Sequence, residues 1–98
     1  MIRVQLPYHL RTLADCDTEV ELEVTEPITA LAVIEALEKK LPTLRGAVLD
    51  RETGKRRPKI RFFACQEDVS HDAMRANLPE EIVNGNEPFM IVGAISGG

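Results

Sequence analysis

The sequence has 98 residues, which is enough for one domain with a single hydrophobic core and too short for two. Its 44% hydrophobic and 29% charged residues are typical of an ordinary globular protein and argue against intrinsic disorder. The 16 acidic residues outnumber the 12 basic ones, and a net charge of −4 argues against a nucleic acid or an anionic membrane as partner.

Two strands are predicted in the first quarter of the chain. Apolar and polar residues alternate over 2–6, and valine or leucine alternates with glutamate over 19–24, which is the period of a half-buried strand. Pro7 cannot donate a hydrogen bond to a sheet, so the first strand is expected to end near it. The polar segment 14–17 predicts a hairpin loop between the two strands.

A helix is predicted next, over 29–41. Its apolar residues recur every three or four positions, which places them on one face of a helix. Thr29 is a suitable N-cap, and Pro42 marks the end because the residue before a proline avoids the helical conformation. Ile34 and Leu37 lie on the apolar face, and we expect both to be buried.

The second half of the chain predicts two more strands, separated by turns. A charged loop over 50–59 precedes a strand at 60–64, and a turn-rich stretch that includes the Asn84-Gly85-Asn86 turn leads to a strand at 88–93. The last strand is expected at the centre of the sheet, between the first strand and the strand that contains Phe62. These elements predict an α+β fold, a mixed sheet of four to five strands with one main helix packed on one face.

The sequence ends in Gly97-Gly98, which suggests a chemical role for the terminus. A diglycine has no Cβ atoms, so it can enter a narrow site and present a free α-carboxylate to a second protein. That carboxylate is a poor electrophile until it is activated, for example by adenylation with ATP. A sulfur or nitrogen nucleophile can then attack the acyl-adenylate, whereas the alternative is a terminus without function.

The order of elements, the Leu41-Pro42-x-Leu44-Arg45-Gly46 segment and the terminal diglycine resemble the ubiquitin-like sulfur carriers of the MoaD/ThiS family. The resemblance implies a β-grasp domain over 1–93 and a flexible C-terminal tail over 94–98. It implies that an E1-like adenylyltransferase recognises Ser96 and Gly97 and adenylates Gly98.

By the same resemblance, Gly98 becomes a thiocarboxylate that donates sulfur to a synthase subunit or enzyme in cofactor or metabolite biosynthesis, such as that of molybdopterin or thiamine. Such a carrier has no catalytic residue and binds no cofactor, because the partner uses the ATP.

Three other functions remain open at this point. The chain could be a protein modifier whose Gly98 forms an isopeptide bond with a lysine. It could be the small subunit of a complex similar to molybdopterin synthase. It could also be a β-grasp interaction module with an inert tail.

Two further surfaces are candidates for partner binding. An activating enzyme needs an apolar patch near the tail, and we expect at least one of Phe63, Phe89 and Ile95 to be more than one-third exposed. Six of the eleven residues over 51–61 are basic, which predicts a solvated loop or a docking contact for an acidic partner in preference to RNA or DNA binding.

The remaining features are consistent with a cytoplasmic protein without bound metal. Cys16 and Cys65 are too few for a disulfide framework and match no spacing of zinc ligands. Cys65 is expected to be a small buried side chain at the end of a strand, and Cys16 an exposed one in a loop. The sequence contains no apolar run long enough to span a membrane and no signal-peptide pattern.

Overall fold

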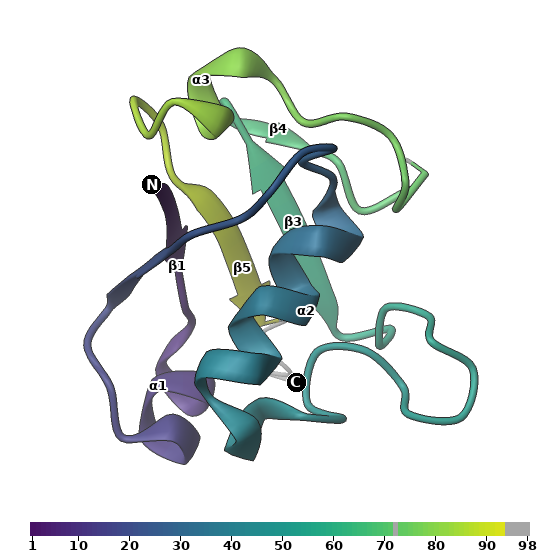
Figure 1. Ribbon diagram of the computed structural model, residues 1–98. Coiled ribbons are helices and arrows are strands. Elements are labelled where there is room, and N and C mark those ends of the chain that lie inside the picture. Colours follow the sequence, from purple (N-terminus) through teal and green to yellow (C-terminus); the bar gives the residue numbers. More distant parts are fainter. Residues whose placement is uncertain (72, 94–98) are drawn as a thin grey trace.

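Five strands form one mixed sheet in the order β2-β1-β5-β3-β4 (Figure 1). The computed structural model of the protein describes residues 1–71 and 73–93. β1 and β5 are parallel, whereas the other neighbouring strands are antiparallel. The predicted central position of the last strand is confirmed. The strands are β1 (Ile2–Gln5), β2 (Glu19–Leu22), β3 (Ile60–Ala64), β4 (Glu67–Asp68) and β5 (Phe89–Gly93).

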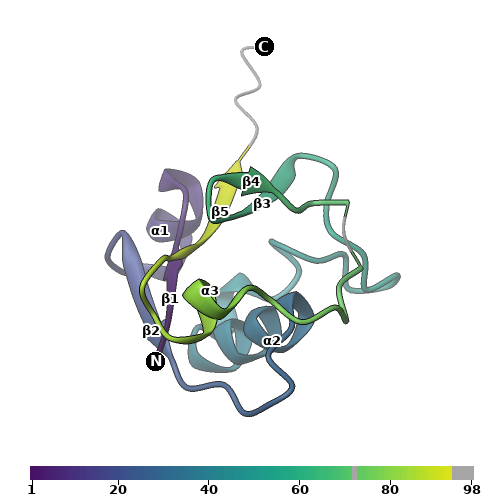
Figure 2. The same ribbon diagram turned by 90° about the horizontal axis from the view of Figure 1, so that it is seen from above.

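One long helix, α2 (Ala30–Lys40), packs across one face of this sheet, so that helix and sheet form two layers (Figure 2). The Thr29 hydroxyl accepts a hydrogen bond from the Ala32 amide at 3.1 Å, which is the predicted N-cap. The side chains of Ile34 and Leu37 are fully buried, as expected. The short 3-10 helix η1 (Pro42–Leu44) follows, and its Leu44 side chain is fully buried in the core.

The core lies between α2 and the sheet. Because side chains alternate along each strand, every second one points towards α2 and into this core. The ring centroids of Phe62 and Phe89 lie 5.4 Å apart with a tilt of 40° between the planes, a favourable aromatic geometry. Ile2, Val4 and Ile91 are buried on the same face. No helix within residues 1–71 and 73–93 is long and apolar enough to cross a membrane.

The connection between β1 and β2 differs from the prediction. Instead of a simple hairpin loop, it contains α1 (Tyr8–Ala14), which begins directly after Pro7. Leu10 is buried and anchors this helix to the core, and Asp15 ends it in a left-handed conformation with a φ of 52°. The single turn α3 (Glu80–Val83), within the stretch that we expected to be irregular, is held by the buried side chain of Ile82.

Candidate functional site

The end of β5 is the point from which the last five residues of the chain continue. On one side, Gly93 pairs with Ile60 of β3. On the other side, α1 approaches so closely that a Cβ on Gly93 would lie 2.6 Å from Cε1 of His9. A glycine at this position therefore lets α1 and the start of β3 flank the end of the central strand. The expected site residues Ile95, Ser96, Gly97 and Gly98, and with them the predicted tail 94–98, lie outside the described residues.

Three apolar side chains form a strip on the face of the sheet opposite α2. Phe63 pairs directly with Met90, and Val92 lies two residues further along β5, so all three point to the same face. Each of them is half-buried. We call Phe63, Met90 and Val92 the outer strip. It leads along β5 towards Gly93 and gives a partner protein apolar surface next to the tail.

Ion pairs border the outer strip on both sides. Arg3 of β1 contacts Glu19 of β2 through two hydrogen bonds, of 2.7 Å from Nε and 3.1 Å from Nη2. The hydrogen bond from Arg3 lowers the pKa of the Glu19 carboxyl below its ordinary value. The borders of the strip are thus polar and ionised at neutral pH, as is typical of the rim of an interface.

On the side of β3 and β4, Arg61 donates to Asp68 at 3.0 Å. Hydrogen bonds from Ser70, and secondarily the contact with Arg61, lower the pKa of Asp68 to about 2. The Ser70 hydroxyl also accepts a hydrogen bond from the Phe62 amide at 2.8 Å. This network holds β4 against β3 beside the outer strip.

The structure corrects one of the expected interface residues. Phe89 is fully buried against Phe62, so it is not part of an exposed patch. Met90 and Val92 take that place, and sequence reasoning missed them. Residues 89–92 are all apolar, so they show no alternation that would tell the inner face from the outer one. Pairing Phe63 with Met90 would have identified them.

Neither cysteine has the environment of a reactive thiol. Cys65 lies in the two-residue turn between β3 and β4, with a φ of 52°, and is half-buried. Burial and the negative charge of Glu81 raise the pKa of the Cys65 thiol. Burial, reinforced by Asp17, raises that of Cys16, which is half-buried where we expected exposure. A raised pKa disfavours the thiolate that a sulfur relay requires.

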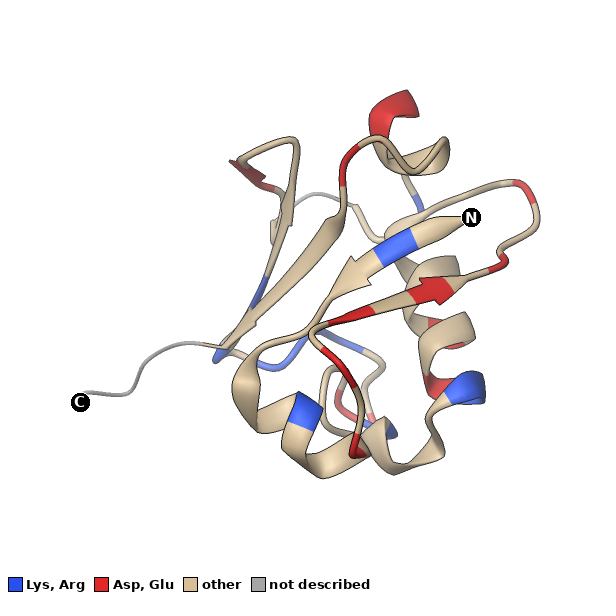
Figure 3. Cartoon of the chain, turned by 90° about the vertical axis from the view of Figure 1, so that its left-hand side faces the viewer, with Lys and Arg blue, Asp and Glu red and all other residues tan. Residues whose placement is uncertain are grey.

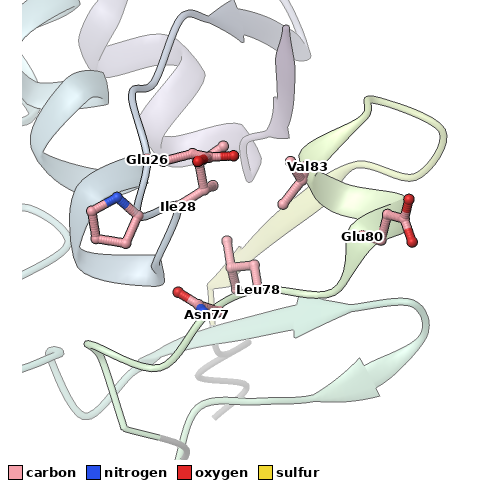
Figure 4. Close-up of a pocket in the computed structure, with 7 residues that line it drawn as sticks. Glu26, Ile28, Asn77, Leu78, Glu80 and Val83 are labelled. Carbon is pink, nitrogen blue, oxygen red and sulfur yellow. The ribbon is translucent and has the colours of Figure 1, made fainter.

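A cavity of about 610 Å³ lies between the segment before α2 and the segment around α3 (Figure 4). Ile28, Leu78 and Val83 supply its apolar lining, and Glu26 and Glu80 lie at its edge. α3 precedes β5, whereas Gly93 ends it, so the cavity lies at the other end of the central strand (Figure 1). It is therefore not part of the tail region.

Among residues 1–71 and 73–93, no group of three or more His, Cys, Asp or Glu side chains could hold a metal ion. The outer strip and the glycine at the end of β5 instead lie together beside the origin of the tail, whereas Arg3 lies level with the start of β5, where it donates to the Gly85 carbonyl at 3.0 Å.

No protein-family model and no curated protein sequence matches the chain. Solved structures, in contrast, match over nearly its whole length. CysO from Amycolatopsis orientalis, in a crystal structure of its complex with BexX, has a TM-score of 0.77 at 22% identity and covers 100% of both chains. Small archaeal modifier protein 1 from Haloferax volcanii has a TM-score of 0.77 at 20% identity, covering 98% of this chain and 97% of its own. The protein of that name from Methanosarcina acetivorans has a TM-score of 0.71 at 20% identity, covering 98% and 94%.

These likenesses confirm the predicted ubiquitin-like β-grasp fold. The matches cover at least 97% of both chains for CysO and the Haloferax volcanii protein, so the likeness extends over the whole domain and is not limited to a fragment of it. The resemblance to MoaD/ThiS carriers that the sequence indicates is thus confirmed at the level of the fold.

Proposed function

We propose that this protein is a ubiquitin-like sulfur carrier whose Gly98 carboxylate is adenylated by an E1-like enzyme and converted to a thiocarboxylate. The observation that supports this most is the position of the diglycine. Gly97-Gly98 follows the end of the central strand by a few residues, in a chain that matches β-grasp proteins along its full length. The outer strip and Gly93, at the end of β5, lie at the origin of that segment.

The chemistry needs only the terminal carboxylate from this chain. A carboxylate oxygen attacks the α-phosphate of ATP, pyrophosphate leaves, and an acyl-adenylate forms. Hydrosulfide supplied by a donor then attacks the carbonyl carbon and displaces AMP. Loss of the remaining sulfur-bound proton to solvent gives the thiocarboxylate. A sulfur-accepting synthase subunit or enzyme, such as one that makes molybdopterin or thiamine, then consumes it.

The body of the protein contributes recognition. A five-residue segment buries too little surface for a specific complex, so the partner must also contact the folded domain. The outer strip is an apolar surface that extends along β5 to Val92, next to the end of the strand. The crystal structure of CysO with BexX supports the expectation that a β-grasp protein of this kind works in complex with a second protein.

The test uses the position of the carboxylate. Deleting Gly98, or adding one alanine after it, displaces the carboxylate by about 3.3–3.6 Å along an extended chain and out of reach of the α-phosphate. We expect both variants to lose ATP–pyrophosphate exchange with the E1-like enzyme of the same organism and to keep the wild-type free energy of unfolding. Intact-mass measurement first checks that Gly98 is the terminal residue of the purified protein.

Equal exchange by the wild type and both variants would contradict the proposal. The inert interaction module would then be the better interpretation, and no change in intact mass would accompany it. A thiocarboxylate, in contrast, raises the mass by about 16 Da, because sulfur replaces oxygen.

The alternative of a protein modifier is favoured by one observation, the likeness to small archaeal modifier proteins. The same acyl-adenylate would then pass to a lysine amine and form an isopeptide bond. Intact-mass and peptide analysis separates the two functions, since a conjugate gains the mass of a whole substrate protein. A small subunit of a synthase complex would instead co-purify with its larger partner without a covalent bond.

A further inference from the structure

The basic and acidic residues of this chain are separated along the sequence and in space. Residues 45–61 contain seven basic and two acidic residues, whereas the rest of the chain contains five basic and fourteen acidic ones. Figure 3 shows basic segments beside the end of β5, and acidic segments on β2, β4 and α3. A net acidic protein therefore has a basic region at one end.

That basic region borders the origin of the tail. Ile60 pairs with Gly93 at the end of β5, so its neighbours Lys59 and Arg61 flank the same point of the sheet. Both side chains are exposed, as is that of Arg57. We call Arg57, Lys59 and Arg61 the basic edge. A partner that receives the tail meets Arg57, Lys59 and the Arg61–Asp68 ion pair as it approaches.

The backbone that bears the basic edge is held in place. The Arg56 side chain donates to the carbonyl oxygens of Ser70 at 3.2 Å and of Ile60 at 2.5 Å, and the Arg57 amide donates to the Val48 carbonyl at 3.0 Å. A loop whose charged side chains are only exposed to solvent needs no such contacts. These contacts hold the backbone of the basic edge in place before a partner binds, which lowers the entropic cost of docking.

The turn at the start of this loop is fixed in the same way. The Asp50 carboxylate accepts hydrogen bonds from the amides of Glu52 and Thr53, at 2.8 and 3.1 Å. These contacts lower the pKa of Asp50 and keep it ionised at neutral pH. One of the two acidic residues of the region is therefore used to hold the turn.

We propose that the basic edge docks against an acidic surface of the enzyme that receives the tail, next to the entrance of its active site. This inference rests on the proposed function. Its physical basis is charge complementarity at a defined place: the basic edge attracts an acidic surface, and fourteen of the sixteen acidic residues of the chain lie outside residues 45–61. The partner is then oriented with its entrance facing the end of β5.

A nucleic acid fits the same observations less well. Its charge extends over many ångströms, so it would also meet the fourteen acidic residues of the rest of the chain. Residues 51–61 also contain no aromatic side chain on which bases would stack. A local acidic surface on a folded protein matches the small size of the edge.

The experiment compares two charge reversals of equal size. Lys59→Glu changes the basic edge, and Lys39→Glu changes an exposed lysine in the last turn of α2, across the molecule. The measured quantity is kcat/KM for ATP–pyrophosphate exchange with the E1-like enzyme of the same organism, at ionic strengths from about 0.02 M to about 0.5 M. We expect Lys59→Glu to lower kcat/KM about tenfold at the lowest ionic strength and to approach the wild type at the highest, because salt screens the contact. Lys39→Glu should differ from the wild type by less than about twofold.

The outcomes distinguish a failure of the docking inference from a failure of the proposed function. Equal losses of kcat/KM for Lys59→Glu and Lys39→Glu would show that only the net charge of the protein matters, and would overturn the docking inference. Exchange by the wild type would still leave the proposed function intact. Absence of exchange by the wild type would overturn the proposed function and this inference with it. Binding of a single-stranded RNA of about 20 nucleotides that Lys59→Glu abolishes and Lys39→Glu does not would replace the protein partner by a nucleic acid.

Discussion

Phe62 and Phe63 are neighbours in β3 with identical side chains, yet they face opposite sides of the sheet and have different surroundings. Phe62 is fully buried against Phe89 beneath α2, whereas Phe63 is half-buried beside Met90 on the other face. Burial of a large side chain on folding contributes to stability in proportion to the apolar area removed from water. The inner residue can therefore serve stability alone, while the outer residue retains apolar surface for a partner.

The same division continues along β5. Phe89 and Ile91 are buried in the core, and the alternating Met90 and Val92 belong to the outer strip. A single strand thus joins the hydrophobic core to the surface next to the tail. Substitutions on its two faces should consequently separate the loss of stability from the loss of partner binding.

The largest expected effect is that of Phe89→Ala on the inner face. Removing a fully buried ring leaves a cavity beside Phe62 in a packed core, and we expect the free energy of unfolding to fall by about 3–5 kcal/mol. Urea denaturation followed by circular dichroism measures it. A loss below about 1 kcal/mol would mean that Phe89 is not a core residue and would remove the contrast between the two faces.

A smaller change in stability but a larger change in function is expected for Phe63→Ala on the outer face. The ring is only half-buried, so the free energy of unfolding should fall by about 1 kcal/mol. In ATP–pyrophosphate exchange, KM for the carrier should rise about tenfold, because an apolar anchor of the interface is lost.

Leu13→Ala is the matched control for Phe63→Ala. Leu13 is 51% exposed on α1 and lies outside the outer strip. The Leu13→Ala substitution removes exposed apolar surface without changing the sheet. The KM for this variant should equal the KM for the wild-type carrier. Equal effects of the two substitutions would mean that the outer strip is not the surface that the enzyme recognises.

The sequence predicts the parts of this fold in which local patterns and packing agree. Strict alternation in 19–24 and the Thr29 cap before an apolar helical face specify β2 and α2, and the structure contains both. The sequence does not predict α1. This helix has only seven residues, about two turns, and Leu10 is its only buried side chain, so it has no periodic apolar face. Its end at Asp15, in a left-handed conformation usually taken by glycine, gives no clear stop signal.

The candidate site could be predicted only in part. The terminal diglycine and the basic residues are visible as composition, whereas the outer strip depends on the pairing of Phe63 with Met90 across strands far apart in sequence. A run of four apolar residues in β5 is compatible with either face until its partner strand is known. The strand register therefore decides that Phe89 faces the core and Met90 faces the outer side, and composition does not determine the register.

The smallest expected effect concerns the ionic border of the outer face and depends on pH. In the folded protein the pKa of Asp68 is lowered from 3.8 to about 2, mainly by hydrogen bonds from Ser70 and secondarily by Arg61. A lowered pKa stabilises the fold fully above the unfolded value near 4, and this contribution is lost as the pH falls towards 2. Asp68→Asn should therefore reduce the drop in Tm between pH 5 and about 2, relative to the wild type. Arg61→Gln should retain most of the wild-type drop, because the Ser70 hydrogen bonds remain.

NMR titration of the Asp68 carboxyl carbon checks the cause directly. A pKa near 4 in the wild-type protein would show that β4 is not held to β3 by this network. The border of the outer strip would then be looser than the core beneath it.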